Sequence, residues 1–220
     1  MQQDTVAAKP LLRGWLHAVT VVPALLGATA LVIAAHQNSA LQLSLIVYGV
    51  SLVLLFAVSA SYHVPRWSAR WDARWRRLDH SMIFVVIAGT YTPVSVNVLD
   101  GPLRVAILAT IWALALVGVM LCMSPFRLPR RVLAVAYVAV GWVAVAALPA
   151  LAVRLGVPGL LYMVGGGLLY SIGALVYASR WPQLWPKVFG YHELFHVMVI
   201  AASAVFFAFI ATDVVPLHGA

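Results

Sequence analysis

The chain alternates long apolar stretches with short groups of charged residues. From Gly14 to Pro65 it contains no Asp, Glu, Lys or Arg, and the polar group from His36 to Ser39 lies near the middle of this stretch. A membrane-spanning helix needs about 20 apolar residues, and a charge at the bilayer centre costs several kcal/mol. This first stretch therefore predicts two spans, at residues 15–35 and 41–64, joined by a short turn.

Five further stretches without these charged residues follow, at 80–99, 105–126, 132–153, 155–179 and 194–212. Pairs such as Gly-Pro and Pro-Gly, which commonly break helices, lie in or beside the interruptions. We place the remaining spans at 80–99, 105–125, 132–153, 157–179 and 192–212. The pattern predicts an all-α membrane protein, a bundle of seven transmembrane helices that forms a single domain over residues 1–220.

The composition agrees with a bilayer as the solvent. Hydrophobic residues make up 64% of the chain and charged residues only 9%, whereas roughly a quarter of a soluble domain is charged. The first apolar run is longer than the 7 to about 15 residues of a secretory signal, so no cleaved signal is expected. The single cysteine, Cys122, lies in the predicted fourth span, which argues against a disulfide framework and against a thiolate metal site.

Basic residues gather on one side of the predicted topology. Of the 14 Lys and Arg residues, all but Arg104 and Arg154 fall on the side of the N-terminus: Lys9, Arg13, Arg66, Arg70, Arg74, Arg76, Arg77, Arg127, Arg130, Arg131, Arg180 and Lys187. Because short cytoplasmic loops are enriched in Lys and Arg, the N-terminus is predicted in the cytoplasm and the C-terminus outside. This bias accounts for the net charge of +8, so no nucleic-acid partner is expected.

Several polar residues fall at the cytoplasmic ends of three predicted spans. Ser59 and His63 lie one helical turn apart at the end of the second span, and Asp79 opens the third. His192 and His196 open the seventh span, and their i, i+4 spacing places them on one helix face. Polar residues within spans are candidates for functional sites. The charge bias thus places three histidines and a carboxylate at one membrane depth.

Three histidine ligands with an open fourth position are typical of a catalytic zinc site. We therefore predict one zinc ion per chain, bound by His63, His192 and His196, although copper, iron and nickel also accept imidazole ligands. Two alternatives stay open. Asp79 is also suited to cap the N-terminus of its helix, and the Ser59 hydroxyl to bond its own helix backbone.

The other histidines have no partner at ligand spacing. They are His17, His36, His80 and His218, of which His17 lies closest to the predicted site and is a candidate for supporting it. Between Arg66 and Arg77, arginines alternate with Trp67, Trp71 and Trp75. This segment predicts an interfacial anchor facing anionic headgroups, in the form of a short helix on the membrane surface or of ordinary packing.

The segment from His192 to His196 also matches the His-Glu-x-x-His motif of metalloproteases, in which the Glu is the general base. Leu99, Asp100 and Gly101 match the Leu-Asp-Gly that supplies a third ligand in intramembrane site-2 proteases. The predicted topology argues against a protease, because Asp100 lies a bilayer away from His192 and precedes the histidine motif instead of following it. Glu193 points about 100° away from His192 and is predicted to face the membrane interface.

Taken together, these segments resemble the bacterial hemolysin III proteins of the progestin and adipoQ receptor (PAQR) superfamily, which are more distantly similar to alkaline ceramidases. The resemblance is carried by Arg13-Gly14 with His17, Ser59 to His63, Leu78-Asp79 with Ala88 to Pro93, and His192 to Val197. It implies a seven-helix bundle in the bacterial cytoplasmic (inner) membrane, zinc on His63, His192 and His196, and a water between the metal and Asp79. His80 stands where the eukaryotic receptors often have Tyr.

The resemblance also implies a lipid-directed hydrolase. In our hypothesis a membrane lipid is the substrate, an amide or ester is hydrolysed, Asp79 orients or deprotonates the water, and Ser59 donates to the oxyanion. Two alternatives are a non-catalytic sensor or homeostasis factor with structural zinc, and a pore-forming hemolysin. The few polar residues in the middle of the spans argue against a pore.

Overall fold

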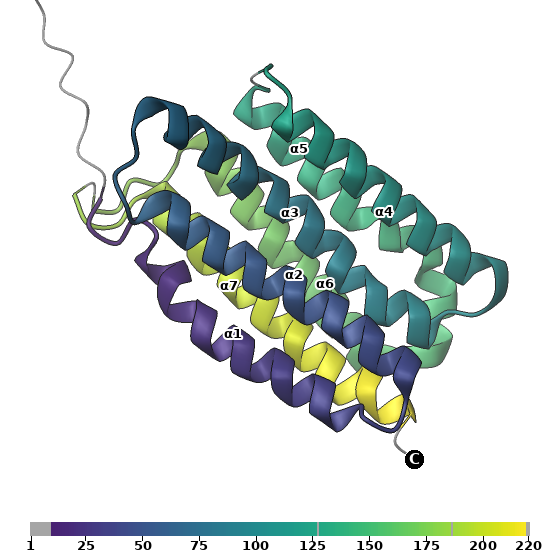
Figure 1. The fold of residues 1–220 in the computed structure, drawn as a ribbon. Helices are drawn as coiled ribbons and strands as arrows, with labels where there is room; N and C mark the ends of the chain where they lie inside the picture. The colour runs from purple at the N-terminus through teal and green to yellow at the C-terminus, as the bar shows by residue number, and fades with distance from the viewer. Residues whose placement is uncertain (1–9, 127, 186, 219–220) are drawn as a thin grey trace, which may run out of the picture.

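The computed structural model describes residues 10–126, 128–185 and 187–218, and their regular structure is helical apart from an isolated bridge between Trp185 and Phe189 (Figure 1). The elements are α1 (Trp15–Ala34), α2 (Ser39–His63), α3 (Ala69–Val98), α4 (Gly101–Met123), α5 (Arg130–Gly141), η1 (Trp142–Ala147), α6 (Leu148–Ser179), α7 (Tyr191–Phe209), η2 (Ile210–Val214) and η3 (Val215–His218). In these parts of the chain, six helical segments are long and apolar enough to cross a membrane. The all-helical membrane fold is therefore confirmed.

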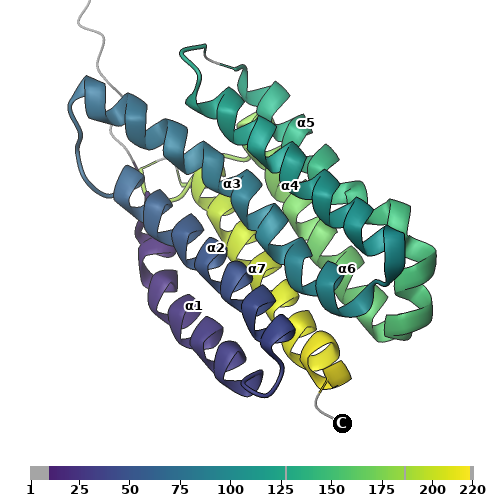
Figure 2. The same ribbon diagram turned by 45° about the vertical axis from the view of Figure 1, so that its right-hand side comes forward.

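The helices form one elongated bundle (Figures 1 and 2). Helices α1, α2 and α7 lie together on one side and α4 and α5 on the other, with α3 and α6 between them. Large side chains such as Tyr48, Phe56 and Phe209 fill the centre of the first group. The outer helices expose apolar surface. In α1, only 17% of the apolar 18-residue stretch is buried inside the protein. Such a surface fits a lipid solvent better than water.

The bundle has two distinct ends. The histidine end is where α2 finishes at His63 and α7 begins at Tyr191, and the opposite end is where α3 finishes at Val98 and α4 begins at Gly101. Arg130 lies over the rings of Tyr177 and Tyr191, with its Cζ 5.1 and 5.7 Å from their centroids. The starts of α5 and α7 and the end of α6 therefore meet at the histidine end.

Helix α3 begins earlier than the third predicted span. It starts at Ala69, so the arginine- and tryptophan-rich segment forms its first turns and is not a separate helix on the membrane surface. Its 30 residues extend over ~45 Å, longer than the hydrocarbon core of a bilayer. The rings of Trp67 and Trp75 stack with centroids 5.4 Å apart. Asp79 consequently lies well inside α3, whose N-cap is Ser68, and the alternative that Asp79 caps the helix is wrong.

The segment from Arg130 to Ser179 is helical almost throughout but is interrupted at Gly156, where φ is 62° and ψ is −167°. Glycine adopts this conformation at little cost because it lacks a Cβ. Just before the interruption, Arg154 pairs with Asp100, which lies between α3 and α4. Residue 154 thus lies at the opposite end, while residues 130 and 177 lie at the histidine end.

Candidate metal centre

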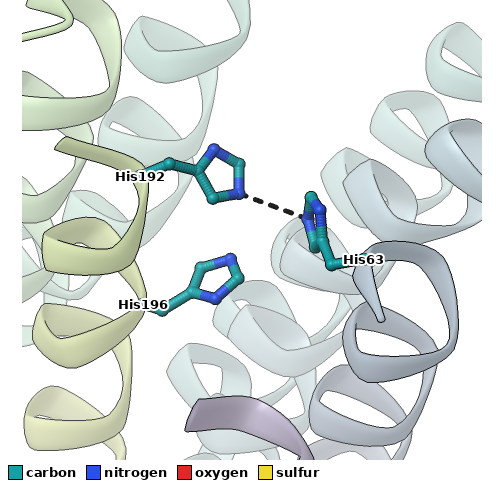
Figure 3. Close-up of side chains that lie close together, drawn as sticks. All are labelled: His63, His192 and His196. Atoms are coloured by element: carbon teal, nitrogen blue, oxygen red, sulfur yellow. Dashed lines mark hydrogen bonds between the residues drawn. The ribbon is translucent and has the colours of Figure 1, made fainter. Parts of the chain in front are cut away.

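Three histidine side chains converge at the histidine end (Figure 3). His63 comes from the last turn of α2, and His192 and His196 come from the first turns of α7. The Nε2 atoms of His192 and His63 are 3.2 Å apart. The candidate ligand atoms of the three residues all lie within 4.8 Å of one another. The structure therefore brings together the three histidines that the sequence predicted, and the group can hold a metal ion.

The chemistry of this group fits a cation. Zinc–nitrogen bonds of about 2.0–2.1 Å in a tetrahedral site place ligand nitrogens about 3.3 Å apart. The closest pair of nitrogens is at 3.2 Å, so small side-chain movements suffice to bring the third within reach. His63 and His196 are buried, and Nδ1 of His196 finds no hydrogen-bond partner in the described chain. A buried polar atom without a partner is costly, and coordination provides one.

Asp79 lies beside the three histidines. Its Oδ2 atom is 3.8 Å from Nε2 of His63 and 3.4 Å from Nδ1 of His80. Nε2 of His80 is in turn 3.2 Å from the Tyr177 hydroxyl, and the backbone oxygen of His80 accepts a hydrogen bond from Tyr137. The carboxylate is thus placed on the same side of the bundle as the ligands, and a chain of side chains from α3 and α6 holds it there.

A small cavity of about 30 Å³ lies among these groups. Its walls include Ser59, Asp79, His192 and His196. This volume accommodates a water molecule or two, and the polar walls supply the partners that a buried water needs. The Ser59 hydroxyl therefore lies next to the same space as the carboxylate and two of the candidate ligands.

A larger apolar cavity of about 140 Å³ adjoins the small one. Leu55, Ile83, Tyr137, Phe195 and Val199 line both spaces. The larger cavity runs between α3, α5, α6 and α7 and reaches Leu99 near the opposite end. It places an extended apolar volume next to the histidines and the carboxylate.

Glu193 is fully buried, and the prediction that it faces the membrane interface is wrong. Its carboxylate forms an ion pair with Arg13 and accepts a hydrogen bond of 2.8 Å from the backbone N–H of Gly190. The face of α7 that carries Glu193 does not meet solvent, because the segment at the start of α1 covers it. Glu193 fixes the beginning of α7, and this role differs from that of a protease base.

The first turn of α1 supports the centre at two further points. Gly14 has φ of 83°, and a Cβ at this position would lie 2.6 Å from Cβ of His63. The buried ring of His17 stacks on that of His196, with centroids 3.9 Å apart and an interplanar angle of 11°. Neither ring nitrogen of His17 has a hydrogen-bond partner in the described chain. The segment from Arg13 to His17 therefore contacts every element that supplies a candidate ligand.

The remaining histidines are placed differently. His80 holds Asp79, a role that ligand spacing alone did not indicate. His36 is exposed between α1 and α2 and bonds the backbone oxygen of Ile33. The side chain of His218 lies outside the described part of the structure. Asp100 pairs with Arg104 and Arg154 at the opposite end, far from a role as a ligand with His192 and His196.

Comparisons with known proteins place the chain among membrane proteins. A model of the family described as haemolysin-III related matches residues 5–207. The chain is 33% identical to Hemolysin-3 of Bacillus cereus over 184 residues, which cover 82% of this chain and 80% of that protein. It is 33% identical to the Hemolysin-3 homolog of Bacillus subtilis (strain 168) over 180 residues, 80% of each chain. It is also 33% identical to the heptahelical transmembrane protein ADIPOR2 of Oryza sativa subsp. japonica over 186 residues, 76% of this chain and 80% of that one.

The buried ion pair between Arg13 and Glu193 generates a stability prediction. Arg13→Gln leaves the fully buried carboxylate without its counter-charge, and we expect a loss of about 3–5 kcal/mol in the free energy of unfolding. Because Glu193→Gln also removes that carboxylate charge, the double variant should be less destabilised than the sum of the two single variants. Denaturant titration in mixed micelles measures all three.

Arg154→Gln is the matched control, since it breaks an ion pair whose two side chains are 58% and 60% exposed. This change should cost at most about 1 kcal/mol. Equal losses for Arg13→Gln and Arg154→Gln, or strictly additive single variants at Arg13 and Glu193, would contradict the importance assigned to the buried pair.

Proposed function

The chain belongs to the haemolysin-III-related family, within the PAQR superfamily, and on that premise we propose that this multi-pass membrane protein is a zinc-dependent hydrolase acting on an amide or ester bond of a lipid. One observation carries the proposal. Asp79 and two members of the three-histidine group, His192 and His196, border a cavity of water-molecule size, and this cavity adjoins a larger apolar one. A polar reacting centre next to apolar space suits a substrate that has a polar linkage and an apolar chain.

In this proposal one zinc ion is held by His63, His192 and His196, since three imidazole ligands leave a fourth position open for chemistry. Such an ion supplies Lewis acidity, which polarises a carbonyl and makes water acidic enough to lose a proton near neutral pH. The fit of the residues supports this choice, because candidate ligand atoms from the end of α2 and the start of α7 lie within 4.8 Å of one another.

The protein's own groups supply the remaining steps. Asp79 accepts a proton from the water in the cavity, and the water oxygen attacks the carbonyl carbon. The Ser59 hydroxyl donates a hydrogen bond to the oxygen that becomes negative. The carbon–nitrogen or carbon–oxygen bond then breaks, and the proton passes from Asp79 to the leaving group. His80, held by Tyr177, keeps the carboxylate in position between these steps.

The lipid substrate is proposed from the position of the apolar cavity. Its lining is almost entirely apolar or aromatic, and five residues are shared with the small cavity that contains Asp79. An acyl chain in the larger space would place its amide or ester linkage beside the histidines. Because the acyl chain comes from the bilayer and not from water, it gains little hydrophobic free energy in this cavity, and the cavity serves to position it.

We further propose seven crossings, with the N-terminus in the cytoplasm and the C-terminus outside, in the bacterial cytoplasmic (inner) membrane. Arg130 and Tyr177 lie together at the histidine end while Arg154 lies at the opposite end, so the segment from Arg130 to Ser179 runs across the bundle and back. If straight, its 50 residues would measure ~75 Å, over twice the hydrocarbon thickness. The excess of Lys and Arg supports a cytoplasmic histidine end.

Thiol labelling tests this topology. In a Cys122→Ser background, Gln37→Cys at the turn after α1 should react with a membrane-impermeant reagent on intact cells. Ser179→Cys at the end of α6 should react only after permeabilisation. Both positions are exposed, so differences in burial do not explain a difference in labelling. Labelling of Ser179→Cys from outside would contradict the seven-crossing topology.

Metal content tests the ligand set. Purified wild-type protein should contain about one zinc per chain, and His63→Ala, His192→Ala and His196→Ala should each lose most of it, because two remaining imidazoles bind much more weakly. His36→Ala, a histidine exposed at the turn between α1 and α2, serves as the control and should retain the metal. Wild type without bound metal, or three variants that all keep it, would overturn this part of the proposal.

Turnover tests the hydrolase itself. The substrates are ceramides and acyl esters in mixed micelles. Asp79→Asn should lower kcat at least about 100-fold, because the side-chain amide cannot accept the proton from water. The zinc content of this variant should stay near one ion per chain. Asp100→Asn, at the exposed opposite end, should leave the rate unchanged. A metal-loaded wild type that hydrolyses none of these lipids would count against the hydrolase and favour the alternative that zinc only ties the helices together.

A further inference from the structure

A second pocket, separate from the cavity that Asp79 borders, has both a basic and an apolar wall. It has a volume of about 60 Å³ and lies between α3, the end of α4 and the start of α5. Arg76, Arg77 and His80 supply its polar wall, and Leu121, Phe126 and Leu133 belong to its apolar wall. Its lining contains no acidic residue.

Neither arginine of this pocket has an ion-pair partner among the described residues. Over the described part of the chain, Arg13, Arg104 and Arg154 each pair with a carboxylate, whereas neither Arg76 nor Arg77 does. Asp79, two residues further along α3, is directed to His63 and His80. Both arginines are nevertheless half-buried. Partial burial of two neighbouring positive charges is unfavourable unless an anion lies between them and neutralises them.

The apolar wall indicates what kind of anion this is. Leu121 is 48% exposed and Phe126 is 80% exposed, and the outward face of α4 continues from them with exposed Val117 and Leu114. A free inorganic anion would gain nothing from this surface. A membrane phospholipid would place its phosphate against the guanidinium groups and lay its acyl chains along α4. Arginine is well suited to this role because its planar fork matches phosphate oxygens.

We propose that Arg76 and Arg77 bind the phosphate headgroup of an anionic membrane phospholipid in this pocket. Basic pockets between helices at the membrane surface are typical sites for such headgroups. The site is independent of the proposed hydrolase activity, since no metal ligand lines it. It is nevertheless adjacent to the metal centre, because His80 lines both this pocket and the small cavity that contains Asp79.

Lipid binding to the purified full chain tests the proposal. Native mass spectrometry, with phosphatidylglycerol or phosphatidylcholine titrated into the detergent-solubilised protein, counts the lipids bound. Wild type should bind one phosphatidylglycerol at least about 10-fold more tightly than phosphatidylcholine. The double variant Arg76→Gln/Arg77→Gln should lose this preference. Its gel-filtration profile and thermal unfolding midpoint, compared with those of wild type, report whether the bundle is intact.

The matched control is Arg70→Gln/Arg74→Gln, which removes two charges from the same helix at exposed positions outside the pocket. It should keep the preference within about twofold. Equal loss in the two double variants would overturn the proposal and assign the effect to general surface charge. Displacement of the lipid by millimolar inorganic phosphate would also overturn it, in favour of a free-anion site.

A second variant keeps the test decisive if loss of both arginines impairs folding. Leu121→Trp at the mouth of the pocket changes no charge, and its larger side chain should hinder entry of the headgroup. We expect it to weaken phosphatidylglycerol binding several-fold. Unchanged binding in Leu121→Trp, together with unchanged binding in the single variant Arg77→Gln, would contradict the assignment.

Discussion

Imidazole and carboxylate groups inside an apolar bundle must find their partners within the protein, and this requirement organises the histidine end. The ion pair between Arg13 and Glu193 is central to it. Glu193 fixes Gly190 at the start of α7, two residues before His192, while Arg13 fixes the start of α1. The ion pair acts together with the stacking of His17 on His196 and with the backbone hydrogen bonds from Leu11 and Leu12 to the segment before α7. The position of two candidate ligands thus depends on a carboxylate that does not itself contact the metal group.

The same requirement explains how polar residues elsewhere in the spans are accommodated. The hydroxyls of Ser51, Thr90 and Thr92 each bond a backbone oxygen of their own helix, at 2.7–2.8 Å. They therefore need no water, and they do not form a continuous polar path through the bundle. This arrangement argues against the pore-forming alternative. Some polar groups away from the histidine end do bond across helices, such as Asn97 with Ser44 and Tyr170 with Ser203. The three candidate imidazole ligands and the carboxylate of Asp79, however, gather at the histidine end.

Much of this arrangement follows from the sequence, because a membrane-spanning chain alternates long apolar stretches with short charged groups. Helix geometry alone places His192 and His196 on one face, since they are four residues apart. The positions at which charged residues give way to apolar stretches predict that His63 lies at the same depth. The charge pattern could not reveal that α3 begins as early as Ala69, since arginines interrupt an apolar run without interrupting a helix. It therefore misplaced the helix start, and the capping role considered for Asp79 followed from that error.

Glu193 and His17 show a different limit. Their angular positions on α7 and α1 follow from helical periodicity, but whether a face meets lipid, water or another helix depends on tertiary packing. Two features pointed to the outcome. Arg13 and Glu193 are opposite charges at the same predicted depth, and Gly14 permits the close approach of α1 to His63. Neither feature alone selects the partner.

The central claim is that His63, His192 and His196 bind one metal ion with an open position beside Asp79. X-ray absorption at the zinc edge of the purified, zinc-loaded protein tests it most directly. The account predicts four-coordinate zinc with three imidazole nitrogens and one further light atom at about 2.0–2.1 Å. A sulfur ligand, or a shell of oxygens without the scattering of imidazole rings, would contradict it.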